Sequence, residues 1–334
     1  MTMKQKLKKA FIDLKHRVPG LWEYLTIKQL RYKFAALKFG IDENRSNRTN
    51  LFNLRRNIHR LEKGLSYPTY KNVFATDYIF PTVDNFCLSV KNGELDDSTK
   101  NWALSVLNLY FKVIDENQSP VVAKAKHQFS EAIQGLALPN DIPYRSSERP
   151  TSNITYDELL NLSIRRRSVR YFSDEPVKLE IIRKAYDIAK YAPSACNRQA
   201  FQFLFFDNPD VVRTLSSIPG GVTGYNLPSI IVVVGRYDGY FDVRDINAPI
   251  IDSSLAIMSF LYAAETLGLG TVCINWPNLI DREKKIRKVL NIHPSEFVVM
   301  MIGVGYPLDH GKIPYSGKRP SSRIVLGNER IKIN

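Results

Sequence analysis

The sequence contains few of the residues that build metal sites or disulfide frameworks. Its three cysteines, Cys87, Cys196 and Cys273, lie far apart, and no CxxC pair occurs in the 334 residues. The five histidines are isolated from one another and from any second ligand at metal-site spacing. Structural zinc sites and disulfide-stapled folds need closely grouped ligands. We therefore expect no metal site and a reducing compartment.

Long apolar runs are absent as well. No uninterrupted stretch approaches the roughly 18 apolar residues of a membrane-spanning helix. The basic N-terminus lacks the apolar core and small-residue cleavage site of a secretory signal. These features predict a cytoplasmic protein.

Acidic residues are scarce in the first fifth of the chain. Residues 1–63 carry 16 Lys or Arg against 5 Asp or Glu, a net charge of +11 out of +14 for the whole chain. Two interpretations stay open. The charge is either a solvated helix face, or a surface in residues 1–45 that meets membrane lipid or an acidic partner, which would place the protein at the inner membrane face. No aromatic-interleaved groove or known binding motif favours nucleic acid.

The chain divides into two parts of different character. Residues 1–150 form a mainly helical, basic region, with apolar stripes at helical spacing over 7–18, 27–41, 51–65, 98–114 and 121–136. Thr49 is the predicted N-cap of the third helix. Residues 138–153 are rich in Pro, Ser, Asn and Arg and are predicted to be a linker.

Residues 154–334 alternate helix and strand. A capping box at Thr155 and Glu158 predicts a helix through Ile164, and further helices are expected before Pro193 and over 250–267 and 281–290. Short apolar runs predict strands over 201–206, 230–234, 271–275 and 297–304. This alternation favours an α/β or α+β sheet flanked by helices.

Four segments in this second part contain chemically suggestive residues. The run Arg165-Arg166-Arg167-Ser168-Val169-Arg170 offers guanidinium forks and a hydroxyl to a phosphate. The turn 192–199, with sequence APSACNRQ, combines small residues with carboxamides that suit the edge of a heterocycle. The run 268–276, GLGTVCINW, turns tightly from a helix into a strand. Two further cations stand in 316–320, SGKRP.

In this order the four segments resemble the nitroreductase family of FMN-dependent oxidoreductases. The resemblance covers residues 156–325, about half the chain. It implies an α+β, three-layer sandwich with a central mixed sheet, preceded here by the mainly helical region. It also implies a homodimer with FMN at the interface, a small-molecule substrate, and NADH or NADPH as the electron donor.

The resemblance also implies roles for individual residues. The FMN phosphate, ribityl chain and pyrimidine edge would be held by Arg166, Arg167, Ser168 and Arg170, with Lys318 and Arg319 reaching the phosphate from the C-terminal segment. The partner subunit would contribute Pro193, Ser194, Ala195, Asn197 and Gln199. The backbone at Ile274 and Asn275 would lie beside the flavin N5, which makes Asn275 the catalytic candidate. The flavin itself carries the redox chemistry.

Departures from the family pattern leave the substrate open. Ala200-Phe201 stands where many members have Pro-Trp, and Trp276 is expected to narrow or stack on the substrate side of the flavin. Hydride transfer to a nitro, quinone or related acceptor is the first hypothesis. The alternatives are a same-fold flavoenzyme with azoline dehydrogenase or dehalogenase chemistry, and a non-catalytic flavin-binding adaptor.

Overall fold

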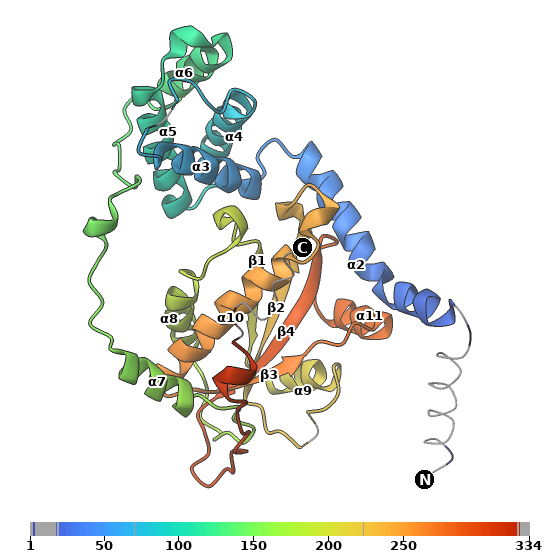
Figure 1. Ribbon diagram of the computed structural model, residues 1–334. Coiled ribbons are helices and arrows are strands. Elements are labelled where there is room, and N and C mark those ends of the chain that lie inside the picture. Colours follow the sequence, from blue (N-terminus) through green and yellow to red (C-terminus); the bar gives the residue numbers. More distant parts are fainter. Residues whose placement is uncertain are drawn as a thin grey trace.

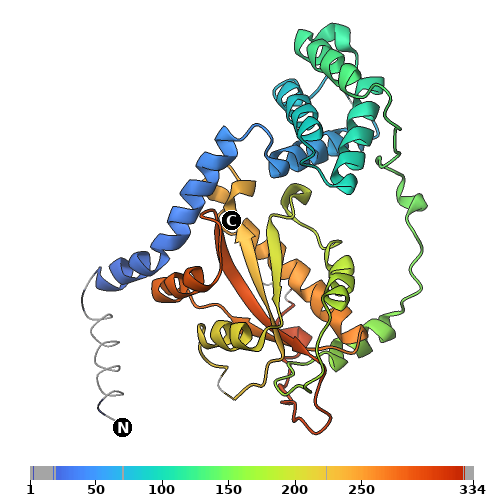
Figure 2. The same cartoon turned by 180° about the vertical axis from the view of Figure 1, so that it is seen from behind.

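The structure is a computed structural model of the chain. It describes residues 20–69, 71–222 and 224–325, together with Met3, Val18 and Gly327. The predicted helix over 7–18 lies outside the described residues, apart from Val18. Figure 1 shows a central sheet with a group of helices above it, and Figure 2 shows the same arrangement from behind.

The sheet has four strands in the order β1-β2-β4-β3. Their bounds are Phe201–Phe206, Ser229–Arg236, Gly270–Asn275 for β3 and Glu296–Gly305 for β4. All three ladders are antiparallel, and the parallel component of the predicted mixed sheet is an isolated bridge between Ser168 and Thr271. The predicted strands are therefore confirmed, and β1 and β3 form the two edges.

Helices cover both faces of the sheet and complete the predicted three layers. On one face, α8 (Leu179–Ala189) and α10 (Ala248–Thr266) pack over Ile231, Val233 and Ile302. On the other, α9 (Pro209–Ser217) and α11 (Ile280–Val289) pack over alternate residues of the same strands. Strand β2 is buried on both sides because its β-branched residues point alternately into the two cores.

A separate helical core lies above the sheet. Helices α3 (Leu51–Leu65), α4 (Ile79–Asn92), α5 (Asp97–Val113) and α6 (Pro120–Ala132) share one buried cluster that includes Leu54, Ile58 and Leu61. The leucine stripe of α3 is confirmed, but its N-cap is Asn50 rather than Thr49. Helices α4 and α9 were not predicted, although Pro209 at the first position of α9 and its N-cap Asn208 are helix-start signals.

A long connection joins this helical core to the rest of the chain. It runs along the side of the molecule from α6 to α7 (Tyr156–Arg165), with one short 3-10 turn at Ser146–Glu148 (Figure 1). The predicted capping box at Thr155 and Glu158 is present and starts α7. The predicted linker thus separates two cores.

Helix α2 (Leu21–Ser46) packs against the sheet rather than against α3–α6. Its buried residues are Ala36, Leu37, Gly40 and Asn44, whereas Ile27 and Phe34 of the predicted stripe are exposed. The helix crosses the 3-10 turn Tyr237–Gly239 so closely that a Cβ at Gly40 would stand 2.5 Å from the Tyr237 carbonyl carbon. This contact therefore depends on the missing side chain at Gly40 and not on the apolar stripe predicted for the helix.

Helix α10 has the length and apolar composition of a membrane span over Val243–Thr266. In this fold it is the central helix of one sheet face, buried against α8 and β2. That position explains the apolar composition of the helix. One side of the helix, which includes Ile251 and Leu255, stays exposed.

We predict that Gly40→Val lowers the free energy of unfolding by about 1–3 kcal/mol or more, because the added side chain overlaps backbone that cannot move away. The measurement is chemical denaturation of the variant beside Ala35→Val, which alters an exposed position on the same helix. Equal stability of the two variants would mean that α2 does not approach the Tyr237 turn this closely.

Candidate functional site

The Arg-Arg-Ser segment leaves helix α7 and meets the open edge of the sheet. Arg166 is the extended residue that ends α7. Ser168 forms the parallel bridge to Thr271, and the amide of Val169 donates to the Thr271 carbonyl at 2.9 Å. The segment is thereby fixed along β3, so that its arginines stand at one end of the sheet.

A cavity of about 80 Å³ forms around this segment. It is lined by Arg166, Arg167, Ser168, Arg170, Pro314, Ser316 and Lys318. Arg167 donates to the Tyr315 carbonyl, which ties the C-terminal segment to the arginines. The two basic segments predicted to converge, 148 residues apart at that bond, therefore share one cavity.

The chemistry of the cavity lining suits a phosphate group. Four of the seven lining residues are cations and two are serines, and no carboxylate is among them. The Nε of Arg166 is buried and has no hydrogen-bond partner within the described residues. A buried guanidinium donor without an acceptor is costly unless a ligand supplies one. The small volume fits a phosphate but not a whole flavin nucleotide.

Two of the predicted phosphate ligands have other contacts. Arg170 donates from Nε to the Tyr225 hydroxyl at 2.9 Å and from Nη1 to the Ser168 carbonyl at 3.1 Å. These two bonds fix its side chain at the edge of the cavity. Arg319 lies outside the cavity lining and donates to the Arg323 carbonyl at 3.3 Å. The bond to the Tyr225 hydroxyl also connects the loop before β2 to the arginine segment.

The strand beside the cavity presents an open edge. Strand β3 pairs with β4 on one side, and on its other side the only bridge in the described residues is the one from Ser168 to Thr271. The backbone groups of Cys273, Ile274 and Asn275 that point away from β4 therefore have no ladder partner. The Ile274 side chain is buried in the core, while Asn275 is exposed. The expected role of Trp276 is wrong. Its ring is only 5% exposed and packs in the core under α9 and α11.

The second predicted segment is a turn in a strained conformation. Cys196, Asn197 and Gln199 all have positive φ, at 54°, 51° and 54°. Left-handed geometry at a residue other than glycine costs free energy and persists only where surrounding contacts enforce it. Inside the turn, Gln199 donates its amide to Ser194 Oγ at 3.2 Å and its Nε2 to Asn197 Oδ1 at 3.2 Å.

Residues outside the turn hold it in place, and the sequence did not identify them. Arg55 of α3 donates from Nε to the Asn197 carbonyl at 2.9 Å and from Nη1 to Thr99 Oγ1 at 2.7 Å, with its guanidinium over the Trp102 ring. Asp252 of α10 accepts the amide of Ala195 at 2.9 Å and the Tyr240 hydroxyl at 3.0 Å. Burial raises the pKa of Asp252.

The turn and the basic cavity lie at opposite ends of the sheet. Ser168 is bridged to Thr271, which pairs through Val304 with Ser229 at the start of β2. The turn precedes Phe201, which pairs with Gly235 at the other end of β2. In Figure 1 the chain before β1 lies beneath α3, whereas α7, which leads into the arginine segment, lies at the opposite end of the sheet. Within one chain, the two parts of the predicted FMN site therefore do not meet.

Comparison with known proteins identifies the same part of the chain. Residues 164–219 and 223–306 match the nitroreductase family. A putative NADH dehydrogenase/NAD(P)H nitroreductase from Archaeoglobus fulgidus is 30% identical over 154 residues, which are 46% of this chain and 87% of the relative. Iodotyrosine deiodinase 1 from Sus scrofa is 26% identical over 215 residues, 55% of this chain and 72% of the relative.

Solved structures align with about half of the chain. A putative NADH dehydrogenase/NAD(P)H nitroreductase from Parabacteroides distasonis is 27% identical with a TM-score of 0.42, over 52% of this chain and 96% of the other. An FMN-dependent nitroreductase from Clostridium difficile is 24% identical with a TM-score of 0.41, over 52% of this chain and 98% of the other. The family match and the archaeal relative show that the chain belongs to the nitroreductase family and is an oxidoreductase.

Proposed function

We propose that the protein is an FMN-dependent oxidoreductase that takes electrons from NADH or NADPH and works as a homodimer. The observation that carries this proposal is the basic cavity, in which Arg166, Arg167 and Lys318 meet without a carboxylate. FMN, when bound, supplies the capacity to accept and return hydride. The protein's part is to bind, orient and shield it.

The residues around the cavity have distinct parts in this proposal. Arg166 and Lys318 bind the phosphate, and Ser168 adds a hydroxyl donor. Because the cavity holds only the phosphate, the remainder of the nucleotide extends along the open edge of β3. There the unpaired backbone near Asn275 orients the ring system by hydrogen bonding.

A second subunit supplies the other side of the site. The strained turn at 194–199 is too far from the cavity to act within one chain, so we assign it to the site of the partner. A two-fold assembly repeats every contact. Each of two equivalent sites would then combine one cavity with one turn.

An exposed apolar face supports this assembly. Helix α7 has no buried residue although it is amphipathic, with Leu159 49% and Ile164 61% exposed. On α10, Ile251 and Leu255 are 56% and 43% exposed. Exposed apolar side chains grouped on two neighbouring helices are typical of an interface. We assign this face to the contact with the partner subunit.

The acceptor is a nitro compound, a quinone or a related small molecule in the first version of the proposal. The deiodinase relatives favour a second candidate, the reductive removal of halogen from an aromatic ring, because their similarity extends over a longer part of this chain. Anaerobic reduction with NADH or NADPH, followed by product analysis with a nitroaromatic, a quinone and an iodophenol, separates the two. Release of iodide would support the second.

The phosphate assignment predicts weaker cofactor binding when the cavity loses charge. We expect Arg166→Ala combined with Lys318→Ala to raise the Kd for FMN at least about 100-fold, because each change removes a charge-assisted bond of about 1.5–3 kcal/mol. Fluorescence titration of FMN measures the change.

The matched control for that variant is Arg213→Ala, which removes an exposed, remote cation paired with Asp210. Its Kd should equal that of the wild type. Unchanged affinity in the double variant would contradict the phosphate site.

The interface assignment predicts a monomer when the apolar face is charged. We expect Ile251→Glu combined with Leu255→Glu to shift sedimentation from dimer to monomer and to lower FMN retention, because buried carboxylates without partners oppose association. Val243→Glu, at a comparably exposed apolar position outside α10, is the control. A dimer that persists with full flavin content would remove this face from the interface.

The turn assignment predicts that the helical core affects cofactor binding. We expect Arg55→Met to raise the Kd for FMN about tenfold, because the Asn197 carbonyl loses the charged donor that holds the turn. Lys63→Met on the same helix is the control, and circular dichroism checks that the helices persist. An unaltered Kd with intact helices would place the turn outside the site.

A further inference from the structure

Three arginines from distant parts of the sequence converge on one aromatic ring, and none of them lines the basic cavity. The guanidinium carbons of Arg56, Arg198 and Arg244 lie 4.3, 5.9 and 5.7 Å from the centre of the Phe241 ring. Arg56 comes from α3, Arg198 from the end of the strained turn, and Arg244 from the 3-10 turn Val243–Asp245. We call these three arginines and Phe241 the junction cluster.

In the described part of the chain, the arginines of the junction cluster have no carboxylate within ion-pair distance, although the charge of Asp252 attracts Arg198. Among the residues that the structure describes, no ion pair involves any of the three arginines. The Asp242 carboxylate accepts the backbone amide of Arg244. Burial, together with repulsion from Arg60, Arg198 and Arg244, lowers the pKa of Arg56. Like charges held this close indicate an anionic ligand.

Arg198 provides a second, independent sign of a missing partner. The residue is only 4% exposed, and its Nε has no hydrogen-bond partner within the described part of the chain. Its Nη1 donates to the Ala195 carbonyl at 3.1 Å, and its guanidinium lies over the rings of Tyr240 and Phe241. A buried, charged donor of this kind needs an acceptor that the protein does not supply.

Arg56 and Phe241 also line a cavity of about 430 Å³ between α2, α3 and α4. Its lining is dominated by carboxamides and cations, and the five asparagines are Asn44, Asn47, Asn53, Asn57 and Asn85. The one carboxylate, Asp84, is already paired with Arg48 at 2.6 Å. Arg45 and Arg56 are therefore the cations that remain for a ligand.

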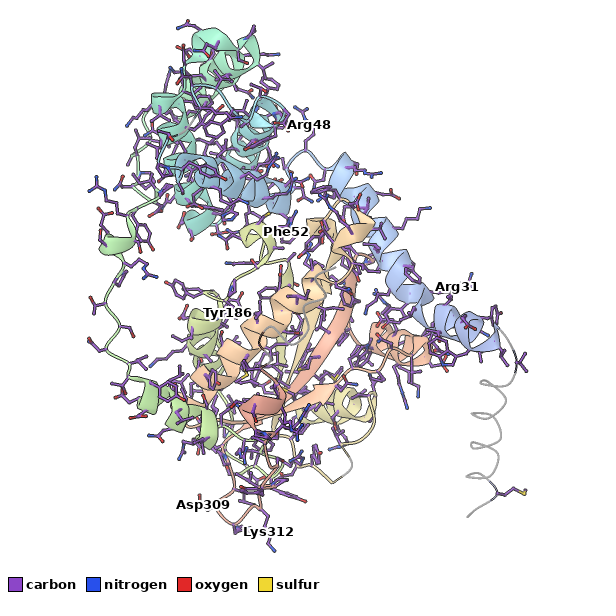
Figure 3. All side chains as sticks on the ribbon, in the orientation of Figure 1. Arg31, Arg48, Phe52, Tyr186, Asp309 and Lys312 are labelled. Carbon is purple, nitrogen blue, oxygen red and sulfur yellow. The ribbon has the colours of Figure 1, made fainter. Side chains whose placement is uncertain are left out.

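Two of the five asparagines, Asn47 and Asn57, offer donors to hydroxyl and oxyanion groups. The Nδ2 groups of the other three already donate within the protein. The oxygen of Asn57 accepts from Arg56 at 3.1 Å and from Arg60 at 3.4 Å, and the oxygen of Asn47 accepts from Thr49. Across the described residues, neither Nδ2 group donates a hydrogen bond within the protein. Figure 3 marks the position of the cavity by Arg48, at the connection from α2 to α3.

We propose that the junction cluster and its cavity bind a small organic anion that carries hydroxyl groups, such as a sugar phosphate or a sugar carboxylate. Arg45 and Arg56 hold the anion, the carboxamides of Asn47 and Asn57 bond the hydroxyls, and the Phe241 face covers the carbon skeleton. The cavity volume lies in the range that encloses a ligand of this size. The cavity shares no lining residue with the basic cavity of the proposed flavin site, although Arg198 of the junction cluster belongs to the strained turn assigned to that site.

Titration calorimetry on the full-length protein tests the proposal with four probes: glucose 6-phosphate, glucuronate, glucose and inorganic phosphate. We expect at least one of the two anionic sugars to bind at millimolar concentration, and more tightly than glucose or phosphate. Arg45→Met combined with Arg56→Met should weaken that binding at least about tenfold, since each change removes a charged donor from the cavity lining. Lys63→Met, on the same helix, should leave it unchanged.

Arg45→Met alone serves as a second variant, because Arg45 is an exposed residue of the cavity lining and its replacement leaves Arg56 in place. It should weaken binding while thermal unfolding and FMN content stay at wild-type values. Three results would overturn the proposal: neither anionic sugar binds, inorganic phosphate binds as tightly as they do, or the double variant binds them with unchanged affinity. Loss of FMN without loss of sugar binding would instead concern the flavin site alone.

Discussion

Four cations converge at one end of the sheet without a carboxylate among the residues that line their cavity, and this charge imbalance governs the rest of the site. A folded chain tolerates such a cluster when a ligand of opposite charge completes it. The capping box that starts α7, the bridge from Ser168 to Thr271 and the bond from Arg167 to Tyr315 all hold the cations in place. Several local contacts therefore maintain this one arrangement of charges.

The second constraint is distance. The strained turn that completes the predicted site stands at the far end of β2 from the cavity, under the helical core. The proposed two-fold assembly across α7 and α10 would resolve this separation and would also cover the exposed apolar side chains of those helices. The helical core then helps to position the site, because Arg55 of α3 donates a hydrogen bond to the turn.

The sequence predicted elements whose pattern is local and missed contacts that depend on packing. The four strands and the α7 capping box follow from β-branched runs and a short motif, and the structure contains each of them. Neither Arg55 nor Asp252 has a local signal, because each acts on a turn more than 50 residues away. Trp276 was misassigned because its position after β3 does not reveal which side of the sheet the ring packs on.

The most direct measurement compares the affinity of the purified, flavin-free protein for FMN and for riboflavin, which lacks the phosphate. Fluorescence titration under identical conditions gives both Kd values. If Arg166, Arg167 and Lys318 hold the phosphate, FMN binds at least about 100-fold more tightly than riboflavin, as two charge-assisted bonds predict. Equal affinity for the two, or no binding of FMN, would contradict the account.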